Sequence, residues 1–542
     1  TTGGGNVAVG KGSLQANTTA SNNTAFGFEC LIANTTGTKN TAVGANCLDA
    51  NTTGDHNTAV GIDALGANTT GASNVAMGDR ALQTNSTASN NTGIGFKALE
   101  ANTTGAKNTA LGYNSLDANT TGENNTGIGG GALSENTTAS NNTALGYAAL
   151  NANTTGAENV AVGADALLSN TTGNDNSALG FAALSSTTTG SDNSGFGQRC
   201  LGANTTGGSN SAFGKNSLRY NTTASNNTAV GFNSLSANTT GATNTAIGDN
   251  ALAKNTTASN NAAGGYRALE ENTTGASNTA FGSEALRENT TADNSTAFGK
   301  SALFANTTGS NNTAVGRSAL SANTTGSYNV AMGVDALDAN TTGGDNVAYG
   351  TNALLANTTG DSNTALGHAA GLNITTGTNN TAIGHDAGKS SSPSGSITTG
   401  SNNICLGDNS ISNLFCADTS ISSSDSRDKT DVTSFNIGLA WINALRPVTY
   451  RWDRRTWYGT DAEPYGTPDG SKKRARLHLG FLAQEALAVE QANGYGSSND
   501  DSLILNLTDD GMSYGMKYER LVPILVNAIK ELSAKVTALE AG

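Results

Sequence analysis

The chain has 542 residues, of which 68 are Gly and only 5 are Pro, with 5% aromatic and 13% charged residues. So few large apolar residues exclude several ordinary globular cores, and so few charges and prolines are atypical of a disordered chain. A net charge of −14 and the lack of any run of 18 apolar residues predict no nucleic-acid partner and no membrane insertion, because these need clustered Lys and Arg and a long apolar segment, respectively.

Residues 1–388, called the shaft below, carry a repeat of 17 residues. A typical unit runs from Asn51 to Ala67, and with its first Asn as position 1, position 11 is Gly in every unit from Gly10 to Gly384. Position 10 is a large apolar residue in every unit except the one with Gly264, and position 15 is Leu in all but the last two units. Since two-helix repeats need about 33 residues or more, this period predicts a parallel β-solenoid.

Each turn of this solenoid is expected to hold two short extended stretches joined by corners that contain Gly and Asn. The alternation in Thr58-Ala-Val-Gly61 places positions 8 and 10 on one face of a strand. The Gly at position 11 predicts a positive φ or a close approach between turns. The Asn at position 1 predicts a ladder of side-chain amides along the axis.

The energetics of one turn predict the oligomeric state. Each turn offers about two sizeable apolar side chains, worth roughly 1.5–3 kcal/mol each when buried. Ordering 17 residues costs on the order of 1 kcal/mol or more per residue. We therefore expect an intertwined or closely packed homotrimer, and twenty-two turns at roughly 4.8 Å would make a rod of about 105 Å.

Short segments of the repeat resemble a known family. Asn6-Val-Ala-Val-Gly10 and Ser73-Asn-Val-Ala-Met-Gly78 are similar to the head repeats of trimeric autotransporter adhesins. That resemblance implies trimers of left-handed parallel β-rolls. The expected fold is thus mostly β, a trimeric parallel β-solenoid or β-roll shaft followed by a small α+β domain that ends in a coiled-coil helix.

The composition changes after the shaft. Residues 389–423 are predicted to form an irregular neck or linker with one further repeat-like turn, and residues 424–542 a separate domain. All three Trp and 14 of the 28 basic residues lie after residue 420. This last part has the composition of an ordinary globular domain.

Four motifs in this last part resemble the intramolecular chaperone domain of phage tail fibres and tailspikes, the endosialidase type. They are Ser422-Ser-Ser-Asp-Ser-Arg-Asp-Lys429, Leu445-Arg-Pro-Val-Thr-Tyr-Arg-Trp452, Gly480-Phe-Leu-Ala-Gln-Glu485 and Tyr518-Glu-Arg-Leu-Val-Pro-Ile-Leu525. The resemblance implies a domain that trimerises, guides the folding of a β-structured shaft and then cuts itself off.

Carried onto this chain, the resemblance makes Ser424 the nucleophile, Lys429 the base and Ser423–Ser424 the bond that is cut. A hydroxyl next to the scissile carbonyl reacts at high effective molarity, and a lysine base needs a pKa well below about 10.4. Arg427 would lower that pKa, whereas Asp428, where the family usually has an apolar residue, would hold the proton on. The expected chemistry is at most a single-turnover autoproteolysis, without cofactors and without activity on external substrates. The alternative is that this run is a solvated turn.

The pattern of the closing segment, residues 518–540, predicts a coiled coil with β-branched residues at one seam position and Leu at the other. This combination alone favours two strands, but we expect a trimer because the preceding parts would impose that symmetry. The predicted trimerisation residues are Val522, Leu525, Ile529, Leu532, Val536 and Leu539.

Two further sets of residues have alternative interpretations. His368 and His385 share position 12 on successive turns, so they are weak candidates for a metal site, with a solvated pair as the alternative. Cys30, Cys47 and Cys200 share position 14, where we expect them to act as small sheltered hydrophobes.

These features predict a fibrous homotrimeric host-attachment protein of the tail-fibre kind, at the virion surface or extracellular. Its partner would be a host cell-surface receptor, and whether this is a glycan or a protein is open. The alternative is a cellular surface adhesin or extracellular fibre subunit outside a virion. An ice-binding solenoid ranks last, because the adjacent Thr18 and Thr19 point in opposite directions. Since the chain opens on Thr1 in mid-pattern, we expect further sequence upstream.

Overall fold

The computed structural model describes residues 2–411, 432–455, 458, 466–498, 501–507 and 514–542. Their contacts form two units: Thr1–Asn380 with Thr399–Asn402, and Thr381–Thr398 with Asn403–Gly542. The domain limits at 388 and 423 stay predictions.

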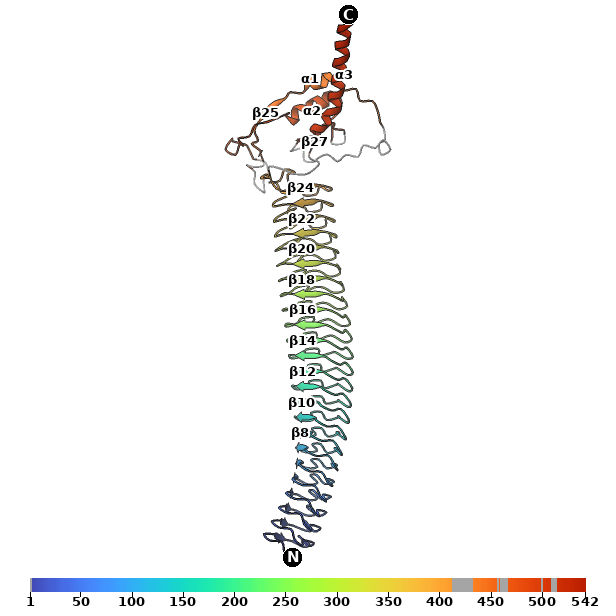
Figure 1. The fold of residues 1–542 in the computed structure, drawn as a ribbon, viewed down its shortest axis with the longest axis vertical. Coiled ribbons are helices and arrows are strands. Elements are labelled where there is room, and N and C mark those ends of the chain that lie inside the picture. The colour runs from blue at the N-terminus through green and yellow to red at the C-terminus, as the bar shows by residue number, and fades with distance from the viewer. Residues whose placement is uncertain (1, 412–431, 456–457, 459–465, 499–500, 508–513) are drawn as a thin grey trace. The chain divides into compact units, whose positions relative to one another are not determined.

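The first unit is a parallel β-solenoid with one three-residue strand in each 17-residue turn (Figure 1). Each strand pairs in register with the strand of the next turn, so that Thr58 lies opposite Val75 and Ala59 opposite Ala76. The predicted mostly-β parallel solenoid is confirmed. The strands of this unit are β1 (Val7–Val9), β2 (Thr24–Phe26), β3 (Thr41–Val43), β4 (Thr58–Val60), β5 (Val75–Met77), β6 (Thr92–Ile94), β7 (Thr109–Leu111), β8 (Thr126–Ile128), β9 (Thr143–Leu145), β10 (Val160–Val162), β11 (Ser177–Leu179), β12 (Ser194–Phe196), β13 (Ser211–Phe213), β14 (Thr228–Val230), β15 (Thr245–Ile247), β16 (Ala262–Gly264), β17 (Thr279–Phe281), β18 (Thr296–Phe298), β19 (Thr313–Val315), β20 (Val330–Met332), β21 (Val347–Tyr349) and β22 (Thr364–Leu366).

The prediction of two extended stretches per turn is wrong for the described residues of this unit. In the turn that begins at Asn51, His56, Gly61, Asp63 and Leu65 all have φ between 52° and 136°. The backbone therefore bends sharply at positions 6, 11, 13 and 15. Only positions 8 to 10 remain straight enough to form a strand.

Each turn buries its own small core. Ala59 at position 9, Ala64 at position 14 and Leu65 at position 15 are fully buried. Position 15 adopts a positive φ even with Leu, and the units that lack Leu have Gly371 and Gly388 there, with φ of 61° and 78°. Glycine fits this position because it adopts positive φ without steric cost.

The Gly at position 11 meets both predicted requirements. Gly61 has a φ of 136°, and a Cβ atom on it would lie 2.4 Å from the carbonyl oxygen of Gly78 in the next turn. Any side chain at this position would collide with backbone, which explains why the pattern never departs from Gly.

The predicted amide ladder at position 1 is confirmed, and a second one occurs at position 7. Asn51 Nδ2 donates to Asn34 Oδ1 at 2.8 Å. At position 7, the backbone N–H of Asn57 donates to Asn40 Oδ1 at 2.9 Å, and Asn57 Nδ2 donates to the Gly71 carbonyl at 2.8 Å. Both Asn columns are buried, so hydrogen bonds between successive turns support each solenoid from within.

Replacing Asn153 by Ala is expected to destabilise the solenoid locally by about 2–3 kcal/mol, because buried partners lose their hydrogen bonds. Asn153 Nδ2 donates to Asn136 Oδ1 and the Gly156 carbonyl, both at 2.8 Å, and its Oδ1 accepts from Asn170 at 2.9 Å. Hydrogen exchange of amides in the flanking turns measures the effect. Thr155→Ala, on the exposed position 3 of the same turn, is the control and should leave exchange unchanged.

The three cysteines at position 14 are free and fully buried. Burial raises the pKa of the Cys47 thiol, and likewise that of Cys200, to about 12. Both therefore stay protonated near neutral pH. This agrees with the prediction that these residues act as small sheltered hydrophobes.

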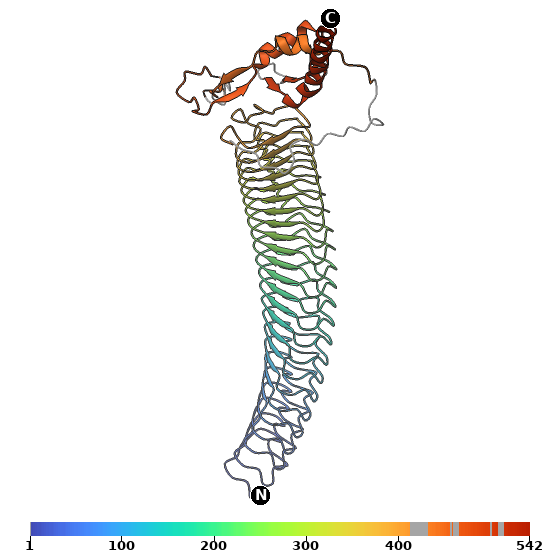
Figure 2. The ribbon, with the colours of Figure 1, turned by 45° about the horizontal axis from the view of Figure 1, so that its top comes forward.

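The second unit contains two more parallel strands and an α+β part (Figure 2). Strands β25 and β26 form an antiparallel hairpin, as do β27 and β28. Its elements are β23 (Thr381–Ile383), β24 (Ile404–Leu406), α1 (Leu439–Ala444), β25 (Val448–Tyr450), β26 (His478–Gly480), α2 (Ala483–Ala492), β27 (Leu505–Leu507), β28 (Tyr514–Met516), the 3-10 helix η3 (Tyr518–Arg520) and α3 (Leu521–Glu540).

The α+β part has one apolar core, which joins α1, α2, β27 and α3. Pro523 lies in the first turn of α3, where a missing backbone N–H is tolerated. None of the helices in the described part of the chain is long and apolar enough to cross a membrane. The buried core residues are Trp441, Leu445, Ala486, Ile504, Leu505, Leu521 and Ile524.

Candidate auto-processing and assembly site

The residues predicted to carry out self-cleavage fall outside the described part of the chain. These are Ser423, Ser424, Arg427, Asp428 and Lys429. The Ser–Lys dyad therefore stays a prediction. The described residues that follow position 431 show how the chain continues from this motif.

Helix α3 holds the first described segment after the motif. Asn527 Nδ2 donates to the carbonyl oxygens of Phe435 at 2.7 Å and Ile437 at 3.2 Å. One helical turn later, the Glu531 carboxylate accepts from the backbone N–H of Leu439, the first residue of α1, at 3.1 Å. The polar side of α3 thus fixes the segment that leads out of the predicted cleavage motif. Neither residue belongs to a motif in the sequence, and the only signal for them is that two polar side chains lie four residues apart among apolar neighbours.

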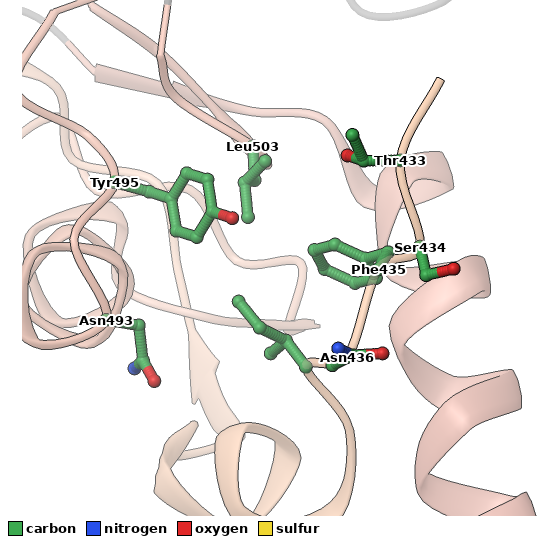
Figure 3. A pocket seen from close by; sticks show the side chains of 8 residues that line it. Thr433, Ser434, Phe435, Asn436, Asn493, Tyr495 and Leu503 are labelled. Atoms are coloured by element: carbon green, nitrogen blue, oxygen red, sulfur yellow. The ribbon is translucent and has the colours of Figure 1, made fainter. Parts of the chain in front are cut away.

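A pocket of about 490 Å³ lies beside this segment. Phe435 on the segment and Tyr495 and Leu503 from the opposite side surround the hollow, as Figure 3 shows. Amide and hydroxyl groups supply most of its remaining polar lining. The described residues that line it are Thr433, Ser434, Phe435, Asn436, Ile437, Asn493, Tyr495 and Leu503.

A buried carboxylate ties α2 to the strand that follows it. Glu490 is fully buried and accepts hydrogen bonds from Ser502 Oγ at 2.9 Å and from the backbone N–H of Ile504 at 2.5 Å. Buried charges are costly unless they are hydrogen-bonded, so this pair of bonds fixes the loop against the helix. Glu490 carries no signal in the sequence, because nothing in the spacing distinguishes it from Glu485, the other acidic residue of α2.

Glu490→Ala is expected to destabilise the α+β part by about 2–4 kcal/mol, because it leaves the buried Ile504 N–H without an acceptor and removes one of the two acceptors near the Ser502 hydroxyl. All three Trp lie in this part, so their fluorescence in urea reports its unfolding. The matched control is Glu485→Ala on the same helix, where the exposed Arg446 guanidinium hydrogen-bonds the carboxylate and lowers its pKa. The midpoint of that variant should stay close to that of the native chain, and equal shifts for both variants would contradict the assigned role of Glu490.

The β25–β26 hairpin carries a cluster of aromatic and basic side chains. The ring of Tyr450 lies 5.2 Å from that of Trp452 and 5.5 Å from that of His478. The Arg454 guanidinium lies 4.3 Å from the Trp452 ring centre, a cation–π distance. Stacking of this kind holds the long arginine side chain in one direction.

Two arginines of the hairpin loop hold Asn409, three residues after the last parallel strand β24. Arg454 Nη1 donates to Asn409 Oδ1 at 3.0 Å, and Arg474 Nη2 donates to the Asn409 carbonyl at 3.2 Å. Asn409 itself donates its backbone N–H to the Ser391 carbonyl at 2.7 Å. Burial, followed by the neighbouring Arg474, lowers the pKa of Arg454. The hairpin thus holds the turn that follows β24. The residues that these hydrogen bonds join lie 45 or more positions apart in the sequence.

The six predicted trimerisation residues of α3 are all exposed in the single chain, with Leu539 81% and Ile529 65% exposed. A different side of the helix packs on its own core through Leu521, Ile524 and Ala528. Among the described residues the seam is therefore at least two-fifths exposed at every position, and its role in trimerisation stays a prediction. Its members are Val522, Leu525, Ile529, Leu532, Val536 and Leu539.

The two candidate metal ligands lie in different units. His368 follows β22 and His385 follows β23, and both are exposed. Within the second unit, His385 Nδ1 lies 3.7 Å from an Asp386 oxygen and 3.8 Å from an Asp408 oxygen. The metal site stays a prediction.

The comparison with known families concerns the part of the chain that begins at the predicted cleavage site. Residues 424–495 match the family model of the chaperone of endosialidase. The match covers α1, β25, β26 and α2 and ends before η3 and α3. It confirms the resemblance for these residues, and with the parallel solenoid it is consistent with an architecture of the tail-fibre or endosialidase type. No curated protein matches the chain.

Proposed function

We propose that this chain is the subunit of a homotrimeric fibre of the tail-fibre kind that attaches to a host cell surface. In this proposal, the endosialidase-type chaperone region trimerises and assists the folding of the shaft. It then separates from the shaft by cleavage before Ser424. The fibre would lie at the virion surface or outside the cell.

The observation that carries the proposal is the endosialidase-chaperone match at residues 424–495 in a chain that also forms a long parallel solenoid. A chaperone that assists a solenoid must contact its strands. Within the second unit, Arg454 and Arg474 donate hydrogen bonds to Asn409, three residues after β24, which supports this proposal. These bonds hold one strand turn in its folded shape, from which further turns would stack.

The proposed cleavage consumes one water molecule. The Ser424 hydroxyl attacks the Ser423 carbonyl carbon, the peptide C–N bond breaks, and an ester forms between the two residues. Lys429 accepts the hydroxyl proton and returns a proton to the departing amine. Water then hydrolyses the ester, leaving a shaft that ends in the Ser423 carboxylate and a fragment that begins with the Ser424 amine.

Exposed apolar residues support the homotrimer. The α3 seam presents Val, Ile and Leu side chains to solvent, and burying each would contribute roughly 1.5–3 kcal/mol. Supercoiled helices bury such a seam against copies of themselves.

Light scattering of the full-length chain tests the assembly. The Ser424→Ala variant keeps the chain intact, so the measured mass should be close to three times 54.2 kDa. A mass of one chain would refute the trimeric fibre.

A further inference from the structure

One face of the first unit carries a column of large apolar side chains along its length. Position 10 of every strand from β1 to β22 is a large apolar residue, except in β16. This side chain points away from the core, because the neighbouring Ala at position 9 points into it. Phe26, Ile247 and Leu366 are 56%, 48% and 49% exposed. We call positions 8 and 10 of β1–β22 the strand face.

The exception in β16 does not interrupt this face. A Cβ atom on Gly264 would lie 2.5 Å from Cδ1 of Phe281, so the Phe281 ring covers the space that a side chain would fill. Phe281 in turn stacks on Phe298, with ring centres 5.4 Å apart. Aromatic surface therefore continues across the missing side chain.

The strand face carries no charge, whereas another side of the solenoid carries many. Position 8 is Thr, Ser, Val or Ala in all 22 strands, and position 10 is never charged. Positions 12, 13, 16 and 17 hold the ion pairs, such as Arg317 with Asp335 at 2.7 Å, Lys97 with Glu100 at 3.0 Å and Arg287 with Glu270 at 3.1 Å. Depletion of charge is typical of the centre of a protein interface.

The exposed apolar area is large enough for a stable interface. A fully exposed Leu or Phe side chain has roughly 100–200 Å² of accessible surface. The position-10 side chains of β1–β22 are about two-fifths exposed, so together they present on the order of 1,000 Å² of apolar surface per copy. A standard interface buries about 800 Å² per partner. Monomeric soluble proteins rarely expose a contiguous apolar patch of more than a few hundred Å².

Every inner strand already has both edges paired within its own chain. β10 pairs with β9 and β11, for example, in the same register as all its neighbours. An interlaced fibre would require strand edges that are open to another chain. The pairing closes the strand edges along the unit to another chain, whereas the face of the sheet stays open to solvent among the described residues.

From these observations we infer that copies of this chain pack side by side along the strand face as closed solenoids, without exchanging strands. A second copy is the occupant that fits, because it presents the same uncharged apolar column with the same step of roughly 4.8 Å per turn. The inference rests on the proposed homotrimer and adds which surface forms it. The sequence left open whether the homotrimer is intertwined or closely packed, and the paired strand edges favour close packing.

Two tyrosines of similar exposure allow a matched test. Tyr349 lies at position 10 on the strand face and is 51% exposed, whereas Tyr328 lies at position 6 and is 61% exposed. Each is replaced in turn by the photoreactive residue benzoylphenylalanine in the full-length Ser424→Ala chain. After irradiation, denaturing gels should show at least tenfold more covalent dimer and trimer for the Tyr349 replacement than for the Tyr328 replacement.

Equal cross-linking at both positions, or cross-linking from position 328 alone, would overturn the inference. Light scattering of the same samples separates this failure from that of the proposed function. A trimer that does not cross-link through position 349 would refute the strand face and leave the trimeric fibre standing. A single-chain mass would refute both.

Discussion

Ser424→Ala is expected to abolish the fragment 424–542 completely. The proposed reaction needs the hydroxyl directly after the scissile carbonyl, where intramolecular attack gains several orders of magnitude in effective concentration. Alanine offers no nucleophile, and no other residue has the same position relative to the Ser423 carbonyl. Mass spectrometry of the purified product reports both the fragment and its first residue.

Two neighbouring substitutions sharpen this experiment. Ser426→Ala removes a hydroxyl from the same run and should leave the fragment intact. Asp428→Ala removes the carboxylate next to Lys429, so we expect it to speed cleavage by roughly tenfold or more, equivalent to a fall of one unit in the lysine pKa. Persistence of the fragment in Ser424→Ala would remove Ser424 from the mechanism.

Deleting residues 424–542 before synthesis is expected to leave the shaft aggregated. Without this region the chain loses the α3 seam, which aligns the copies in the proposed trimer, and the hydrogen bonds from Arg454 and Arg474 to Asn409. A shaft without the chaperone region would expose the strand edges of partly formed turns as well as the strand face. Both surfaces promote aggregation. Sedimentation followed by electron microscopy of the soluble fraction measures the outcome.

The control for this deletion is the full-length Ser424→Ala chain, which keeps the chaperone attached and should give soluble rods. Adding the fragment 424–542 as a separate chain should rescue little, because an attached chaperone acts at a far higher effective concentration. Soluble, regular rods from the truncated chain would disprove the chaperone role.

The repeat made much of the solenoid predictable. An invariant Gly at position 11 and a recurrent Asn at position 1 pointed to a backbone collision and an amide ladder, and the structure shows both at Gly61 and Asn51. The single strand per turn was not predictable in this way, because Asp63 and Leu65 adopt positive φ. L-amino acids with side chains of this kind rarely do so.

The apolar positions of the repeat were harder to assign. The periodic pattern shows that positions 10 and 15 are apolar, but it does not tell which of them points into the solenoid and which points out to solvent. The structure buries Leu65 at position 15 inside the chain and leaves Phe26 at position 10 on the outside. Each copy therefore has a thin core of its own, and the outer column is available for contact between copies.

In the C-terminal part, motifs predicted the kind of domain but not its contacts. The closing helix and its seam followed from heptad spacing, and α3 places that seam at the surface. The grip of Arg454 on Asn409 and the bonds from Asn527 to Phe435 and Ile437 join residues far apart in sequence. No local spacing rule relates such residues, so only the folded chain reveals them.

Cryo-electron microscopy of the purified fibre, viewed in cross-section, shows directly whether closed solenoids pack along the strand face. We expect three complete solenoids around one axis, with the position-10 side chains facing inward and every strand paired within its own chain. A map of a solitary solenoid whose Phe26, Ile247 and Leu366 side chains contact only water would contradict this expectation.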